Sequence, residues 1–165
     1  MARYQLVTEW QVDAPVDRVW DALLRVREWP TWWHGFRSVD VLEDGEESGV
    51  GMQVRQRWRS VLPFTLVLDL EIVGVLQRRL LEGRSSGDMA GTCRWTFSER
   101  EGRTRIRFEM DVRPTRWWMN LPIPFAGRVV AWNYDAIMRW GGEGLARRLG
   151  VDVADLPALA EAARA

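Results

Sequence analysis

The sequence predicts a single α+β domain in which a curved antiparallel sheet of about seven strands wraps around a long C-terminal helix. Three features predict this fold. Residues 4–12 alternate between apolar and polar side chains, residues 36–112 continue the alternation through a series of short turns, and residues 125–149 change to a helical period. Consecutive strands joined by short turns favour antiparallel pairing with one face open to solvent. A length of 165 residues is usual for one domain.

Two short helices are expected after the first strand. Asp13 and Pro15 suit the start of a helix. An apolar stripe with helical spacing follows them, formed by Val16, Val19, Trp20, Leu23 and Leu24. Pro30 then interrupts the chain, and the dense aromatic segment around it, residues 29–33, predicts a second short helix.

The strands each show one apolar face, except in one segment where the phase is ambiguous. Around residues 78–84, Leu80 and Leu81 are adjacent, so the alternation leaves open whether Glu82 and Arg84 face the core or the solvent. Solvent is the more frequent environment for charged side chains. The direction of these two side chains decides whether the core contains a pair of charged groups.

The long helix is expected from about Phe125 to Leu149, with an apolar stripe toward the sheet that consists of Phe125, Val129, Trp132, Ala136, Ile137 and Trp140. Glycines at 141, 142 and 144 lie inside it, and each costs about 1 kcal/mol relative to alanine. They predict a kink or a close contact between helix and sheet. Residues 1–150 are expected to form the domain, and residues 151–165 a tail that is a short helix or frayed.

The composition limits the class of partner. The 23 basic residues balance the 23 acidic ones, and the arginines at 55, 57 and 59 are expected beside Asp69 and Glu71 as exposed ion pairs, so no nucleic-acid surface is predicted. No apolar run is long enough to span a bilayer, and no secretory leader is expected. A single cysteine excludes an internal disulfide. We therefore expect a cytoplasmic protein without stable membrane insertion. All its basic residues are arginine, which is typical of a GC-rich, bacterial genome.

Several segments together resemble the START-like superfamily of helix-grip folds. This superfamily, also called SRPBCC, includes the polyketide cyclase/dehydrase family. The segment at 14–23 resembles its first-helix signature, and further similar segments follow at residues 29–33, 39–42, 49–51, 95–97 and 104–106. The resemblance covers residues 5–149 and implies the fold more than any one activity. It implies a cavity between sheet and helix for a lipid, sterol, polyketide, quinone or plant hormone, and it implies no cofactor.

The alternation assigns the side chains that would line such a cavity. They lie on the helix-covered face of the strands, on the facing side of the helix or at the cavity entrance: Met52, Val54, Gln56, Trp58, Phe64, Leu66, Leu68, Trp95, Phe97, Phe108, Met110, Val129, Trp132, Asn133, Ile137 and His34. This lining is mostly apolar with a few polar groups, as in most small-molecule sites. Gln56 and Asn133 need hydrogen-bond partners, which a ligand, the backbone or water could supply.

The eleven tryptophans have two interpretations that composition does not separate. They form either a bulky core or the walls of a pocket. Trp58, Trp95 and Trp132 are the better candidates for pocket walls. Trp117 and Trp118 precede the long helix, where they could form a lip over the cavity, pack against the helix or contact a membrane or a partner.

Candidates for catalysis are weak. His34 is the only histidine, so paired-histidine catalysis and histidine metal clusters are excluded, and no metal site is expected. Glu82 and Arg84 would supply an acid–base pair if both faced the cavity. Cys93 lies on an apolar face and is expected to be a small buried hydrophobe rather than a nucleophile.

Three functions remain open from the sequence. The leading hypothesis is binding or carriage of a hydrophobic small molecule such as a lipid, polyketide or quinone. The alternative is an aromatase/cyclase-like enzyme that acts on a polyketide. The third is a protein-interaction module whose interior is filled by tryptophan. A hydrophobic ligand is the only partner implied, and the choice between a monomer and a homodimer stays open.

Overall fold

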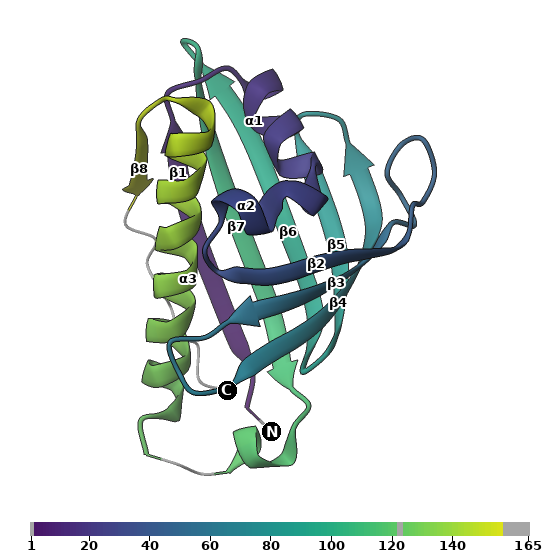
Figure 1. The fold of residues 1–165 in the computed structure, drawn as a ribbon, viewed down its shortest axis with the longest axis vertical. Coiled ribbons are helices and arrows are strands. Elements are labelled where there is room, and N and C mark those ends of the chain that lie inside the picture. Colours follow the sequence, from purple (N-terminus) through teal and green to yellow (C-terminus); the bar gives the residue numbers. More distant parts are fainter. Residues whose placement is uncertain (1, 122–123, 157–165) are drawn as a thin grey trace.

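The computed structural model of the chain describes residues 2–121 and 124–156. Its strands form one antiparallel sheet of eight strands, in the order β2-β3-β4-β5-β6-β7-β1-β8 (Figure 1). The strands are β1 (Tyr4–Val12), β2 (Phe36–Glu43), β3 (Gln53–Arg59), β4 (Thr65–Leu76), β5 (Leu80–Gly87), β6 (Met89–Arg100), β7 (Arg103–Pro114) and β8 (Val153–Leu156).

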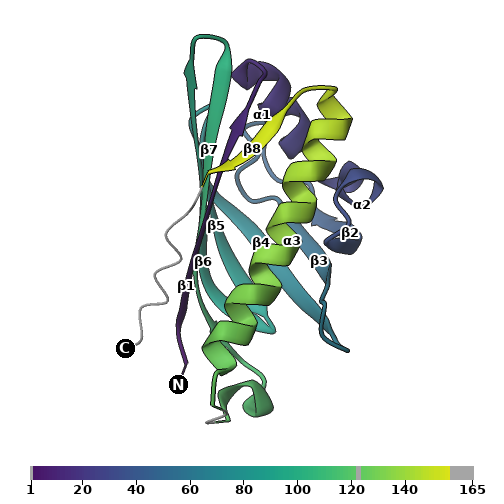
Figure 2. The same ribbon diagram turned by 90° about the vertical axis from the view of Figure 1, so that its left-hand side faces the viewer.

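The helices all lie on one side of this sheet (Figure 2), whose face toward them is called the inner face below. They are α1 (Val16–Leu24), η1 (Val26–Glu28), α2 (Trp29–Trp32), η2 (Trp117–Asn120) and α3 (Ala126–Leu149). The predicted α+β fold is confirmed: two short helices follow the first strand, and the long helix comes after the sheet. Apolar alternation explains this arrangement, because the side chains on one face of each strand are buried beneath the helices.

The C-terminal segment differs from the prediction. Residues 153–156 were expected in a helical or frayed tail, and they instead form β8, which pairs with β1 in a register that joins Val12 to Val153. The physical reason is the free edge of β1, whose backbone groups need hydrogen-bond partners that a short neighbouring strand supplies. Residues 157–165 of the predicted tail lie outside the described residues.

The glycines of α3 allow the close contact that their spacing predicted. A Cβ atom at Gly141 would overlap the ring of Trp33 and lie 2.8 Å from Cη2 of Trp10, and one at Gly144 would overlap the backbone of Trp32. The helix runs unbroken through these positions from residue 126 to 149. The glycines therefore bring the backbone of α3 against aromatic side chains, and they do not kink it.

We predict that Gly141→Ala lowers the free energy of unfolding by about 1–3 kcal/mol, because the added methyl group has no room beside Trp33. The matched control is Gly127→Ala in the same helix, where a Cβ atom meets nothing within 4 Å. That variant should leave stability unchanged or raise it by up to about 1 kcal/mol. Urea denaturation of both variants measures the difference. Equal stability of the two would contradict the close contact.

Candidate ligand-binding site

An aromatic cluster fills the part of the interior between α2, the C-terminal half of α3 and the sheet. Its members are Trp10, Trp29, Trp32, Trp33, Phe36, Trp58 and Trp95. Trp33 is at the centre, with ring centroids 4.9 Å from Phe36, 5.4 Å from Trp29 and 5.5 Å from Trp10. Such tilted and edge-to-face contacts are the favoured geometry for aromatic rings. At this end of the molecule, the tryptophan side chains form part of the hydrophobic core.

Two indole N–H groups of the aromatic cluster have no hydrogen-bond partner among the described residues. The N–H of Trp29 donates to the carbonyl of Leu23 at 3.0 Å, and that of Trp33 donates to the carbonyl of Ile137 at 2.9 Å. Nε1 of Trp10 and Nε1 of Trp32 are both buried and unpaired. A buried donor without a partner costs about 1–3 kcal/mol, so each such group needs an explanation.

A pair of hydroxyl groups joins α3 to β1 next to the aromatic cluster. Oγ1 of Thr8 and the hydroxyl oxygen of Tyr134 are 2.9 Å apart, and Tyr134 is only 5% exposed. Burial is the main cause that raises the pKa of the Tyr134 hydroxyl, so the group stays protonated at neutral pH. The two hydroxyls carry two protons, and one hydrogen bond between them uses one. The second proton has no acceptor in the described part of the chain.

The strand register places apolar side chains around this hydroxyl pair. Thr8 on β1 is opposite Phe108 on β7, which is opposite Trp95 on β6. The rings of Trp95 and Phe108 stack with centroids 4.2 Å apart. Trp95 and Thr8 keep part of their surface exposed, although both lie on the inner face. The site therefore combines apolar walls, spare hydrogen-bond donors and side chains that are incompletely covered.

A second row of the inner face borders the first and contains the single cysteine. Cys93 on β6 is opposite Met110 on β7, and Met110 is opposite Leu6 on β1. Burial raises the pKa of the Cys93 thiol to about 12. A thiol with this pKa is protonated at neutral pH and is a poor nucleophile. The prediction that Cys93 is a small buried hydrophobe is confirmed.

Most of the residues predicted to line a cavity do face inward, and their ligand role stays a prediction. Those in the strands or directly before them are buried or partly buried: Met52, Val54, Gln56, Trp58, Phe64, Leu66, Leu68, Trp95, Phe97, Phe108 and Met110. They do not form one group. Phe97 packs against Trp20 of α1, and Phe64 packs against Trp118 of η2. Neither contact involves the Thr8–Tyr134 pair.

The two buried amides have partners within the protein. Oε1 of Gln56 accepts the indole N–H of Trp58 at 2.9 Å. Oδ1 of Asn133 accepts a hydrogen bond from Oγ of Ser60 at 3.0 Å and another from the backbone N–H of Val61 at 2.9 Å. Asn133 thus attaches α3 to the loop between β3 and β4. A ligand is not needed to explain why either amide is buried.

The predicted inward face of α3 is wrong at three positions. Phe125 is 67% exposed, Val129 is 40% exposed and Trp132 is 56% exposed, while Asn133, Ala136 and Ile137 are buried as expected. Tyr134, which was not predicted to face inward, is buried beside Asn133. The physical reason is that these two polar side chains find hydrogen-bond partners inside the protein, which offsets the cost of burying them. Tyr134 was missed because only its partner Thr8, far away in sequence, identifies its role.

The remaining catalytic candidates face away from the interior. His34 is exposed, and its ring packs edge-on against Trp140 with centroids 4.8 Å apart. Glu82 pairs with Arg94 at 2.7 Å, and Arg84 lies 3.8 Å from Glu71, both on the outer face. Leu81, Gly83 and Ser85 are the buried residues of this strand, so Glu82 and Arg84 lie on its other face. The hypothesis of an inward acid–base pair is therefore wrong.

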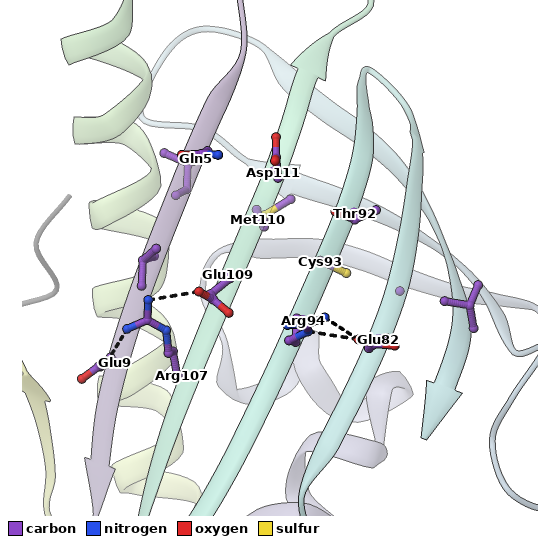
Figure 3. A pocket seen from close by; sticks show the side chains of 14 residues that line it. Gln5, Glu9, Glu82, Thr92, Cys93, Arg94, Arg107, Glu109, Met110 and Asp111 are labelled. Carbon is purple, nitrogen blue, oxygen red and sulfur yellow. Dashed lines mark hydrogen bonds and ion pairs between the residues drawn. The ribbon is translucent and has the colours of Figure 1, made fainter. Parts of the chain in front are cut away.

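The outer face of the sheet carries a groove of about 790 Å³ (Figure 3). Charged side chains that are already paired line it: Arg107 is 2.7 Å from Glu9 and 3.0 Å from Glu109, and Arg94 contacts Glu82. These pairs form the polar, solvated face that the alternation predicts. Apolar residues such as Val7 and Val73 belong to the same lining, so the groove mixes charged and apolar side chains and is not the apolar cavity that the sequence predicts.

The expected ion pairs between neighbouring strands are confirmed for one arginine. Arg55 donates two hydrogen bonds of 2.8 Å to the carboxylate of Asp69, and this contact lowers the pKa of Asp69. Arg57 pairs with Asp40 of β2 instead, at 2.5 Å. All four side chains lie on the outer face, so they stabilise a solvated surface and do not contribute to the interior site.

Comparison with known proteins agrees with this fold. Residues 3–150 match the sequence model of a family described as polyketide cyclase / dehydrase and lipid transport. Similar solved structures include a START superfamily protein from Mycobacterium smegmatis, with 14% identity, a TM-score of 0.71, and coverage of 89% of this chain and 97% of that one. The Zhui aromatase/cyclase from Streptomyces sp. R1128 has 17% identity, a TM-score of 0.70, and coverage of 88% and 96%.

A plant protein is also similar. Major latex-like protein 151 from Panax ginseng has 11% identity, a TM-score of 0.65, and coverage of 90% of this chain and 98% of that one. No curated protein matches the sequence. At these identities the solved structures establish the fold alone.

No helix among the described residues is long and apolar enough to cross a membrane. No group of three or more histidine, cysteine, aspartate or glutamate side chains in the same residues is placed to hold a metal ion.

We predict that Asn133→Ala lowers the free energy of unfolding by about 1–3 kcal/mol, because Ser60 and the backbone N–H of Val61 lose their acceptor. Glu143→Ala, at an exposed position of the same helix, is the control and should be neutral. Urea denaturation compares the two. A stability unchanged by Asn133→Ala would mean that the loop does not depend on this side chain.

We also predict that Cys93 reacts slowly with iodoacetamide. At pH 8 a thiol with a pKa of about 12 has on the order of a thousandfold less thiolate than one with an ordinary pKa. Because Cys93 is the only cysteine, mass spectrometry of the intact protein follows its reaction directly. The protein unfolded in guanidinium provides the reference rate. If the native protein reacts as fast as the unfolded chain, the thiol is neither buried nor protonated.

Proposed function

The chain belongs to the polyketide cyclase / dehydrase and lipid transport family, and from this membership we propose that it binds a hydrophobic small molecule in the interior beside Tyr134. The ligand carries at least one carbonyl or hydroxyl oxygen. It lies between α3 and the inner faces of β1, β6 and β7. The class includes ring compounds such as quinones and polyketides.

The spare donors of the interior support this proposal most directly. The proton that the Thr8–Tyr134 pair leaves without an acceptor and the free N–H of Trp10 lie on the same side of β1, since Thr8 and Trp10 are two residues apart. Both groups donate, so they match an oxygen acceptor. Such a bond removes the cost of a buried unpaired donor, and it favours ligands with a carbonyl group over pure hydrocarbons.

The apolar surroundings supply the remaining affinity. Trp95, Phe108, Met110 and Leu6 lie around the hydroxyl pair in the two rows of the inner face. Removal of apolar ligand surface from water contributes about 25 cal/mol for each Å² buried. The donors would then fix the orientation of the ligand, and the aromatic walls would hold its rings.

Binding is better supported than catalysis for this interior. The buried polar side chains of the described residues include Gln56, Ser85, Thr104 and Asn133, and none of these is charged. Cyclisation of a polyketide needs groups that take up and release protons. Burial keeps Tyr134 and Cys93 protonated at neutral pH. An interaction module with a filled interior agrees with the aromatic cluster, but it does not explain the spare donors of Tyr134 and Trp10.

A matched pair of probes tests the proposal. We expect anthraquinone, which carries two carbonyl groups, to bind more tightly than anthracene, as measured by quenching of tryptophan fluorescence. Tyr134→Phe should weaken anthraquinone binding about five- to tenfold and leave anthracene binding unchanged, since only the first ligand accepts a hydrogen bond. Tyr4→Phe, the same substitution at the other tyrosine, is the control and should change neither affinity.

The outcomes that contradict the proposal are distinct. Equal losses for both probes would show that Tyr134 acts through packing and not through its hydroxyl group. Failure of the purified protein to bind either probe, together with the absence of any hydrophobic molecule in native mass spectra and solvent extracts, would favour the interaction module.

A further inference from the structure

Large apolar side chains are exposed together at one end of the molecule. They lie in η2, in the connection to α3 and on the first turns of α3: Trp117, Leu121, Phe125, Val129 and Trp132. Trp117 is 75% exposed and Phe125 is 67% exposed. Val129 and Trp132 are three residues apart in α3, so they share one side of the helix, and Phe125 directly precedes the helix. We call this set the exposed apolar surface. Exposed apolar side chains gathered in one region mark an interaction site more often than single ones do.

One exposed basic side chain lies within this surface. Between Asp111 and Asp135 the sequence contains three arginines, Arg113, Arg116 and Arg128, and no acidic residue. Arg116 is paired with Asp88 at 2.6 Å, and Arg113 lies on the outer face of the sheet near Asp111, whose pKa is lowered by Arg3 and, to a smaller extent, by Arg113. Arg128 is exposed between Phe125 and Val129. A surface that combines indole rings with an exposed arginine is complementary to an apolar layer beneath anionic groups.

We propose that the exposed apolar surface docks the protein on the surface of an anionic phospholipid bilayer. Tryptophan is enriched at the level of lipid headgroups, because its ring is apolar and its N–H remains hydrated. A helix with one apolar side and nearby arginines can lie in the plane of the interface. No described helix is able to span a membrane, so the contact is peripheral.

The shape and charge of this end favour a bilayer over a second copy of the chain. η2 and the start of α3 extend beyond the sheet at one end of the molecule (Figure 1), which suits contact with a planar surface. In a symmetric dimer through the same surface, Arg128 of both copies would lie in the interface. Like charges at an interface oppose association. The docking argument uses only these exposed residues and does not require a ligand beside Tyr134.

Flotation of the protein with lipid vesicles tests the proposal. Wild-type protein should float with phosphatidylcholine vesicles that contain about 30% phosphatidylglycerol, bind less to pure phosphatidylcholine, and dissociate as salt screens the charges. Trp117→Ser combined with Trp132→Ser should reduce partitioning into the anionic vesicles by at least roughly tenfold. Phe125→Gly removes a third aromatic ring at a position with φ of 68°, which suits glycine.

Charge and apolar contributions are separated by two more variants. Arg128→Glu should weaken binding to the anionic vesicles by at least roughly fivefold and leave the weak binding to phosphatidylcholine unchanged. Leu76→Ser is the matched control. Leu76 is 58% exposed and lies by α1, since Arg78 of the same hairpin pairs with Asp17. The Leu76→Ser variant should bind vesicles as the wild type does. Circular dichroism checks that each variant is folded.

Two results would overturn the proposal. In the first, wild-type protein fails to float with anionic vesicles, or the Trp117/Trp132 double variant floats as well as the wild type. In the second, sedimentation shows a wild-type dimer that the double variant converts to monomer while vesicle binding is absent. The exposed apolar surface would then be a self-association interface. Neither result bears on quinone binding at Tyr134, so failure of this proposal is distinguishable from failure of the proposed function.

Discussion

The contact between α3 and the aromatic cluster determines the position of the rest of the helix. Gly141 and Gly144 carry no side chain where α3 meets this cluster, so the backbone can approach the rings. The indole N–H of Trp33 then donates to the carbonyl of Ile137 in the same helix. This hydrogen bond fixes both the position of α3 along its axis and its rotation about that axis, relative to Trp33. Because Tyr134 lies one turn before Ile137, the same contact places its hydroxyl next to Thr8 on β1. The geometry of the candidate site thus depends on how α2 and α3 pack.

The interior has two parts that differ in chemistry. Toward α1 and α2, aromatic rings pack against each other, and the N–H groups of Trp29, Trp33 and Trp58 find carbonyl or amide acceptors, although that of Trp32 does not. Along β1, the hydroxyl pair and Trp10 leave donors without acceptors. A protein interior made only for stability would pair or omit such donors, because each unpaired one is costly. The excess of donors over acceptors therefore favours a ligand with acceptor oxygens, because such a ligand supplies the missing hydrogen bonds.

The fold could be predicted from the sequence because its signal is local and repeated. Alternation over successive strands defined the sheet, and the glycines of α3 indicated a close contact. The rotation of α3 could not be predicted in this way. Hydrophobicity favours Trp132 as the buried residue, yet Tyr134 is buried because its partner Thr8 lies 126 residues away in the sequence. No pattern within one segment carries information about such partners. The same limit applies to β8, which is a strand only because the edge of β1 is next to it.

The exposure of Trp132 and the burial of Tyr134 are connected. Trp132 and Tyr134 are two residues apart in one helix, which places them about 200° apart around its axis. Tyr134 faces β1, and Trp132 faces solvent. An exposed indole forgoes the favourable free energy of burial, and it is accompanied here by Val129 and Phe125. That combination is explained if the outer side of the helix is buried against something other than this chain. A bilayer on one side of the helix and a ligand on the other would place the source of a hydrophobic molecule within a few helical turns of its site. The ligand would then reach Tyr134 without crossing the charged outer face of the sheet.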